Sequence, residues 1–434
     1  MRIPVVFDVF ARAGRAKGSL RLAVSLACFA IIASSASQLR ANDLIGPGAP
    51  EGLQEKLSPA TTWCIAHGMT IRVAPYRHVT MPRKYRDATE KYATQVRLSH
   101  DDALENYVAG LPFPIVDTND PRAAAKIVWN HLLSWGTTDD SDLRGIRAET
   151  GSLTPDGKLR TEATYRVQDL REMGFLGRIF GDSGPAVMGP PGVARAMLLG
   201  PFDAPGQWRG MSFLLHRFAD PSRRESAWMY MPDMRKVREV PAFDPSSAQL
   251  GQDIDFHSMW GYSGRLGDMK WKYLGERTVF ASVHGANLPS RRATAGSFAF
   301  EDVWEPRTVY VIEGSSSDPV YSYGKRILYV DKETFVIPHS EIYSPDGQLW
   351  KMQINFLSFR PRTAPPGGTA ETDEFPHYAG ILMVDAQTSH ATTVELASAD
   401  AAANSGWYYN WGESSGIRAD IFAPSRLDQM NSFR

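Results

Sequence analysis

Short segments in which apolar side chains alternate with polar ones, or run unbroken, recur from about Gly145 onward, and each predicts a β-strand. The clearest series lies between Arg307 and Phe359, where RTVYVIEG, GKRILYVD, TFVIPHSEIY and QLWKMQINFLSF follow one another. Their links are short, and Ser344–Gly347 has the composition of a tight turn. Sequential strands joined in this way predict an antiparallel meander.

The segment Ser226–Pro241 predicts a β-hairpin. Its first arm, Ala227–Met231, is apolar on both faces, whereas its second arm, Arg235–Val240, alternates charged side chains with valine. A strand with large apolar side chains on both faces needs apolar cover or a ligand on each side. We therefore predict that the first arm binds an apolar ligand, and core packing is the alternative for each side chain. The predicted ligand-binding residues are Trp228, Met229, Tyr230 and Met231.

The part of the chain before the strands is expected to contain helices. Lys84–Val96 is charged and has helical composition, and Asp120 followed by Pro121 is a strong helix start signal. The helix Pro121–Trp135 carries His131 on its apolar stripe. We interpret His131 as a core histidine, because no second metal-ligand residue lies one turn away. The glycine- and proline-rich segment Phe175–Arg195 is expected to be a mobile loop over a cavity.

Residues 1–41 are predicted to be an export signal. A basic lead precedes Leu22–Ala33, an apolar run of twelve residues that is too short to cross a bilayer. Cleavage is expected after Ala36 or Ala41, and an uncleaved N-terminal anchor is the alternative. Residues 42–434 would then form a single domain in the periplasm. Only Cys64 would remain after cleavage, so no internal disulfide is expected, and Cys64 is interpreted as a buried small hydrophobe.

The composition excludes some classes of function. The 434 residues are 43% hydrophobic and 22% charged, which is ordinary globular usage. The net charge of −1 argues against a nucleic-acid surface and gives no broad attraction to anionic lipid. Aromatic residues make up 11% of the chain, and together with 36 glycines and 29 prolines they favour a β-rich fold.

Candidate catalytic chemistry is sparse. Asp253, Asp255 and His257 alternate along the chain, so on a strand they would share one face and could hold a metal. A polar strand edge or loop near Trp260 is the favoured interpretation. The sequence contains no GxSxG, HExxH, P-loop or CxxC motif. We therefore predict no catalytic residues, no metal site and no cofactor.

Several long stretches resemble a family of Gram-negative periplasmic proteins that are outer-membrane-lipoprotein-sorting-like and are catalogued as a domain of unknown function. The matching stretches are Gly110–His131, Ala227–Pro241, Asp268–Glu276, Trp304–Gly314 and Lys325–Lys351. The resemblance implies a mostly-β fold in which a large curved antiparallel sheet forms an unclosed, LolA/LolB-like half barrel with helices plugging its concave face. It also implies an apolar cavity that takes lipid acyl chains in better-known relatives. The family supplies no agreed catalytic residues.

These observations predict a periplasmic protein that binds or carries a lipid-like hydrophobic molecule between envelope membranes without covalent catalysis. Its expected partners are that molecule and envelope transport proteins, and no nucleic acid. Two alternatives stay open. One is a metal-assisted hydrolase of the cell envelope that uses Asp253, Asp255 and His257. The other is a structural or interaction protein that binds a partner strand at its sheet edge.

Overall fold

The computed structural model describes residues 42–48, 51–136, 139–179, 189–220, 223–240, 244–248, 250–316, 318, 321–368, 372–398 and 405–432. The predicted export signal, residues 1–41, lies outside the described residues, as do residues 180–188 of the predicted mobile loop and Pro241 of the predicted hairpin. Within the described part of the chain, no helix combines the length and the apolar character that crossing a membrane would require.

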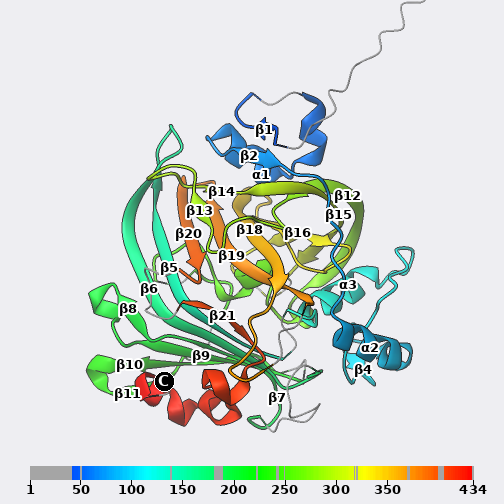
Figure 1. Cartoon of the computed structure of the whole chain (residues 1–434), viewed down its shortest axis with the longest axis vertical. Helices are drawn as coiled ribbons and strands as arrows, with labels where there is room; N and C mark the ends of the chain where they lie inside the picture. Colours follow the sequence, from blue (N-terminus) through cyan, green and yellow to red (C-terminus); the bar gives the residue numbers. More distant parts are fainter. Residues whose placement is uncertain are drawn as a thin grey trace, which may run out of the picture. The chain divides into compact units, whose positions relative to one another are not determined.

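One 17-stranded sheet dominates the fold (Figure 1). Its main run is antiparallel throughout. In spatial order this run is β11 (Lys236–Glu239), β10 (Ser226–Met231), β9 (Ser212–Phe218), β7 (Val193–Leu199), β6 (Leu159–Gly174), β5 (Asp140–Leu153), β20 (His390–Leu396), β19 (Glu374–Asp385), β18 (Leu349–Pro361), β17 (His339–Tyr343), β16 (Lys325–Asp331), β15 (Val303–Ser315) and β12 (Lys270–Ala281). No pairing joins β11 to β12 within the described residues, so the curved sheet is unclosed, as predicted.

The predicted meander is confirmed, because β15, β16, β17, β18 and β19 pair in sequence order. One strand is shorter than predicted. The segment TFVIPHSEIY forms a strand only over His339–Tyr343, and Phe335–Ile337 is buried ahead of it without strand pairing. Pro338 is the physical reason, because proline cannot donate a hydrogen bond to a sheet ladder.

The remaining strands extend or flank this sheet. β21 (Gly406–Tyr409) pairs with β5 beyond the end of β20, and β8 (Phe202–Ala204) pairs with β6. Near the N-terminus, β2 (Ile71–Val73) pairs in parallel with β15 and antiparallel with β1 (Leu44–Ile45). Two small separate ladders are β3 (Arg97–Leu98) with β4 (Leu104–Glu105) and β13 (Arg291–Arg292) with β14 (Phe300–Glu301).

The helices of the described residues are short, and they lie before, between and after the strands. They are η1 (Glu51–Lys56), α1 (Pro59–Ala66), α2 (Arg83–Tyr92), η2 (Ala93–Gln95), α3 (Ala123–Leu132), η3 (Gly206–Trp208), η4 (Pro232–Met234), η5 (Phe256–Gly261), η6 (Leu266–Asp268), η7 (Gly412–Ser415), η8 (Ala419–Phe422) and η9 (Pro424–Ser432). In α1, the Ser58 hydroxyl caps the helix by accepting from the Thr61 backbone N–H at 3.1 Å. Cys64 of α1 is fully buried, as interpreted, and burial raises the pKa of its thiol.

The predicted helix over Pro121–Trp135 forms as the shorter α3, which begins at Ala123 and ends at Leu132. Asp120 still marks its start, because its Oδ1 accepts from the Arg122 backbone N–H at 2.7 Å. His131 is a buried core residue, as interpreted. Its Nδ1 lies 2.7 Å from the Phe335 carbonyl oxygen and its Nε2 lies 2.8 Å from that of Tyr262. These contacts join the helix to the segment after β16 and to the residue that follows η5.

The predicted hairpin forms as β10, η4 and β11, and its first arm is covered on both faces. Trp228 and Tyr230 pack with the buried side chains of η8 and η9, including Ile421, Phe422 and Leu427. Met229 points the other way and packs against the main core cluster, to which α3 also contributes. The C-terminal segment 412–432 therefore supplies apolar contacts on one face of the arm, and the main core cluster contacts Met229 on the other.

An apolar cavity and the polar network beside it

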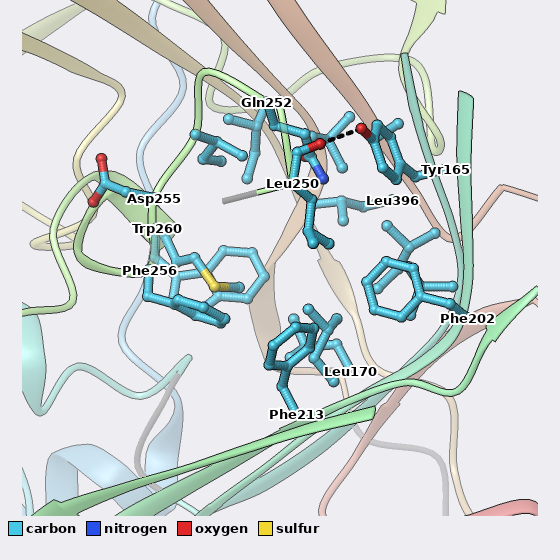
Figure 2. A pocket seen from close by; sticks show the side chains of 18 residues that line it. Tyr165, Leu170, Phe202, Phe213, Leu250, Gln252, Asp255, Phe256, Trp260 and Leu396 are labelled. Atoms are coloured by element: carbon cyan, nitrogen blue, oxygen red, sulfur yellow. Dashed lines mark hydrogen bonds between the residues drawn. The ribbon is translucent and has the colours of Figure 1, made fainter. Parts of the chain in front are cut away.

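An apolar cavity of about 110 Å³ lies between the inner face of the sheet and the segment Leu250–Trp260 (Figure 2). Its lining side chains are apolar except for those of Tyr165, Gln252, Asp255 and the indole nitrogen of Trp260. The sheet wall comes from Ile146, Ala148, Tyr165, Val167, Leu170, Leu199, Phe202, Phe213, Ile381, Val394 and Leu396. Such a pocket, mostly apolar with a few polar groups, is typical of sites for apolar small molecules.

Sheet pairing places the wall residues in register. Leu170 of β6 is paired with Leu199 of β7, and Leu199 is paired with Phe213 of β9. Directly paired residues point to the same face of a sheet, so the three side chains form one row across the cavity wall. Phe213 also lies edge-on to Phe202 and to Phe256, with ring centroids 6.1 Å apart in both cases.

Most polar groups around the cavity are already hydrogen-bonded within the protein. The Tyr165 hydroxyl donates to the Leu250 carbonyl oxygen. The Trp260 indole N–H donates to Glu172 Oε1 at 3.1 Å. Gln252 differs, because its half-buried side-chain amide has no hydrogen bond with a described residue. The cavity therefore presents hydrocarbon, with one unengaged amide at its border.

The segment that closes the cavity is anchored by buried ionic contacts. Asp255 caps η5 by accepting from the Ser258 backbone N–H at 2.9 Å. Arg326 of β16, which is fully buried, donates to Asp255 Oδ1 at 3.2 Å and to the Ser258 hydroxyl at 2.9 Å. The Tyr323 hydroxyl donates to Asp255 Oδ2 at 2.8 Å. These contacts fix Phe256, a cavity-lining residue next in the chain, against the sheet.

Asp253, Asp255 and His257 do not converge on one point. They lie in a loop and the first turn of η5 rather than on a strand, which agrees with the favoured interpretation. Asp253 contacts His390 Nδ1 at 2.8 Å, whereas Asp255 contacts Arg326. Across the described ranges, no three His, Cys, Asp or Glu side chains are grouped so that they could hold a metal ion. The geometry therefore does not favour the metal-dependent alternative.

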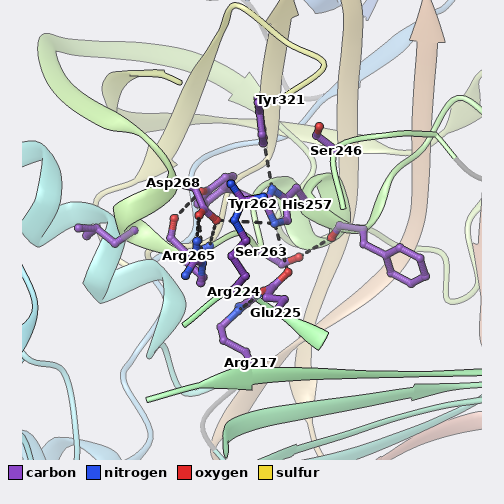
Figure 3. A network of polar contacts seen from close by, with 12 residues as sticks. Arg217, Arg224, Glu225, Ser246, His257, Tyr262, Ser263, Arg265, Asp268 and Tyr321 are labelled. Carbon is purple, nitrogen blue, oxygen red and sulfur yellow. Dashed lines mark hydrogen bonds and ion pairs between the residues drawn. The ribbon is translucent and has the colours of Figure 1, made fainter. Parts of the chain in front are cut away.

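His257 belongs to a polar network beside the cavity (Figure 3). Its Nε2 lies 3.3 Å from Glu225 Oε2, and its Nδ1 lies 3.3 Å from the Tyr321 hydroxyl. Arg217 Nε donates to Glu225 Oε1 at 2.7 Å. Burial by itself raises the pKa of Glu225, but the Arg217 charge and the His257 contact outweigh it and lower the pKa to about 2. Glu225 is therefore a carboxylate at neutral pH.

The same network spans the unpaired edges of the sheet. Arg224, just before β10, contacts Asp318, just after β15, at 2.8 Å. Arg265, just before β12, donates to the Arg223 carbonyl oxygen at 2.6 Å. These contacts hold one end of the β10–β11 hairpin beside one end of β12. At this end the start of the hairpin therefore meets the ends of β12 and β15 through one exposed ion pair and one side-chain hydrogen bond, without strand pairing among the described residues.

None of the four residues predicted to bind the ligand lines this cavity. Met229 lies nearest to it in the sheet, because it is paired with Phe213. The sequence did not predict that the segment Leu250–Trp260 closes a cavity. Only its polar residues had been considered, as candidate metal ligands. The available signal was the interleaving of Leu250, Ile254 and Phe256 with those polar residues, which places apolar side chains on the cavity side.

Comparison with known proteins places the chain among proteins without an assigned activity. A family described as "Protein of unknown function (DUF1329)" matches residues 50–427. An uncharacterized protein of Pseudomonas aeruginosa is 24% identical over 302 residues, which are 64% of this chain and 60% of that protein's length. The match therefore spans less than two thirds of this relative.

Solved structures with similar folds come from several bacteria. A domain described as an outer membrane lipoprotein-sorting protein, from Vibrio parahaemolyticus, is 15% identical with a TM-score of 0.44 and matches 67% of this chain and 92% of that one. A DUF1329 family protein from Desulfovibrio piger is 14% identical with a TM-score of 0.43 and the same coverage. A LolA superfamily protein from Nitrosomonas europaea is 14% identical with a TM-score of 0.38 and matches 69% of this chain and 97% of that one.

Proposed function

The chain belongs to this DUF1329 family of proteins of unknown function, and we propose that it binds a lipid-like hydrophobic molecule and carries it between envelope membranes without covalent catalysis. The single observation that carries the proposal is the cavity between the inner sheet face and Leu250–Trp260, which presents almost only hydrocarbon. The proposal includes a periplasmic location, with residues 1–41 as the export signal, and envelope transport proteins as partners.

The cavity volume sets what can enter without rearrangement. An engineered protein cavity of about 150 Å³ binds benzene, so the 110 Å³ here admits a short piece of hydrocarbon. Each buried methylene contributes roughly 0.8 kcal/mol, so tight binding requires a longer buried chain. A longer chain must displace side chains of the closing segment, of which Phe256 and Met259 are half-buried. Loading therefore requires movement of this segment.

The proposed ligand contacts on the hairpin divide by face. Met229 and Met231 project from the inner face of β10 and would meet a chain that leaves the cavity toward the sheet edge. Trp228 and Tyr230 project from the outer face and would reach a ligand only if the C-terminal segment 412–432 moved aside. Methionine suits this role, because its side chain is flexible and polarizable.

Native mass spectrometry of the processed protein, gently purified from its own periplasm and followed by solvent extraction, tests the proposal. A discrete bound molecule with a hydrocarbon chain is the expected result. An apo mass with no extractable hydrophobic ligand, combined with no binding of an added fluorescent fatty acid, would overturn the proposal. Metal analysis of the same sample tests the hydrolase alternative, which requires stoichiometric metal.

A further inference from the structure

The cavity wall continues as a row of side chains to the open edge of the sheet. Phe213 of β9 is paired with Met229 of β10, and Met229 is paired with Arg238 of β11. Together with Leu170 and Leu199, these residues make one cross-strand row on the inner face. The row therefore begins in the hydrocarbon cavity and ends on a guanidinium group at the edge strand.

A second cation lies beside the first. Lys236 is paired with Met231, so it projects from the same inner face as Arg238. Both side chains are exposed, and neither makes an ion pair with any residue that the structure describes. The acidic residue of β11, Glu239, is paired with Trp228 and therefore projects from the outer face. Two uncompensated positive charges thus stand at the inner edge.

The spacing between cavity and cations suits a molecule with two unlike ends. Neighbouring strands lie about 4.8 Å apart, so the backbone of Arg238 is roughly 10 Å from that of Phe213. Met229 is half-buried between them and offers an apolar surface along the way. A ligand whose chain occupied the cavity would place its other end near Arg238 and Lys236.

We propose that the cargo is an anionic amphiphile, whose hydrocarbon chain occupies the cavity and whose carboxylate or phosphate head pairs with Arg238 and Lys236. This inference rests on the proposed function and specifies its ligand. Arginine suits the role, because its planar guanidinium binds a carboxylate or a phosphate through two parallel hydrogen bonds. An exposed ion pair is weak by itself. The chain therefore supplies most of the affinity, and the cations select the head group.

The other edge strand provides a matched control. Lys270 and Lys272 of β12 are also exposed and make no ion pair within the described part of the chain. They alternate with Trp271 and Tyr273, which pack against the main core cluster, so the two lysines project outward from the sheet. They equal Lys236 and Arg238 in charge and edge position, but they face away from the cavity.

The test compares three forms of the full processed chain: the native protein, the double variant Lys236→Glu with Arg238→Glu, and the control Lys270→Glu with Lys272→Glu. Affinities are measured by displacement of a fluorescent fatty acid, using hexadecanoate, a sixteen-carbon lysophosphatidylglycerol and uncharged hexadecanol. We expect the double variant to lose about tenfold in affinity for the anionic ligands while keeping its affinity for hexadecanol. The control should behave as the native protein. Preference between the two anionic ligands distinguishes a carboxylate head from a phosphate head.

Three results would contradict the inference. They are equal affinity of the native protein for hexadecanol and for both anionic ligands, unchanged anion affinity in the double variant, and an equal loss in the control. If the native protein still binds hexadecanol in these cases, the proposed carrier function is retained and only the anionic head group is excluded. Failure of the native protein to bind any of the three ligands would overturn the carrier function itself.

Discussion

Arg326 and Asp255 form an ion pair of 3.2 Å in which both side chains are inaccessible to solvent. Arg326 belongs to the sheet, and Asp255 belongs to the segment that closes the apolar cavity. Removing one partner of such a pair leaves the other charge buried and uncompensated, which costs about 3–5 kcal/mol. Mutation of either partner should therefore weaken the attachment of the closing segment to the sheet.

We expect Arg326→Met to lower the free energy of unfolding by about 3–5 kcal/mol, measured by urea denaturation. Arg224→Met provides the control, since its contact with Asp318 is largely exposed and its loss should leave the denaturation midpoint unchanged. A midpoint of the Arg326 variant equal to that of the native protein would contradict this role for the pair.

The pH dependence of stability should report on Glu225. Its pKa in the folded protein, about 2, lies below its usual value, so its carboxylate stabilises the folded state above about pH 4.5. This contribution is lost as the pH falls toward 2. We expect Glu225→Gln to be less stable than the native protein at pH 6, and the difference to shrink steadily between pH 5 and pH 2.

Urea midpoints measured across this pH range test the prediction for Glu225. The matched control is Glu413→Gln, which changes an exposed carboxylate in the turn η7. A constant difference between the Glu225 variant and the native protein over the whole range would show that the Glu225 charge does not contribute in the way described.

Filling the cavity should reduce ligand binding. Ala148 lies on the cavity wall and is buried, so Ala148→Leu adds hydrocarbon to a space of about 110 Å³. We expect affinity for a fluorescent fatty acid to fall at least tenfold, with a loss of stability of about 1–3 kcal/mol from overpacking. Ala386→Leu, which lies at another apolar cluster, should keep the native affinity. Unchanged binding by the Ala148 variant would place the ligand elsewhere.

The two faces of the hairpin should respond differently to mutation. Met229 lies in the row that leads from the cavity, so Met229→Ala should weaken binding of a fatty acid. Trp228 and Tyr230 pack with the C-terminal segment, so Trp228→Ala with Tyr230→Ala should lower stability and expose residues 412–432 to proteolysis. Limited proteolysis and ligand titration of both variants test this division. If the double variant bound the ligand less well than Met229→Ala at equal stability, the outer face would be the principal contact.

Local patterns predicted much of the secondary structure. The hairpin that begins at Ser226, the meander from Arg307 to Phe359 and the helix near His131 all formed where alternation, turn composition and capping indicated them. Each depends on residues close in the chain, whose side-chain spacing fixes which face becomes buried. The unclosed sheet itself was expected from family resemblance and not from these patterns.

Which residues line the cavity was decided by the tertiary structure. Its wall joins residues of β5, β6, β7 and β9 to residues of β19 and β20, and its other side is the segment Leu250–Trp260, which forms no strand and reaches the wall only through long-range packing. The same long-range packing separated Asp253, Asp255 and His257, because each found a partner that is distant in the chain: His390, Arg326 and Glu225. Spacing along a chain fixes which residues share a face, but which distant charge meets each residue depends on how the sheet curls.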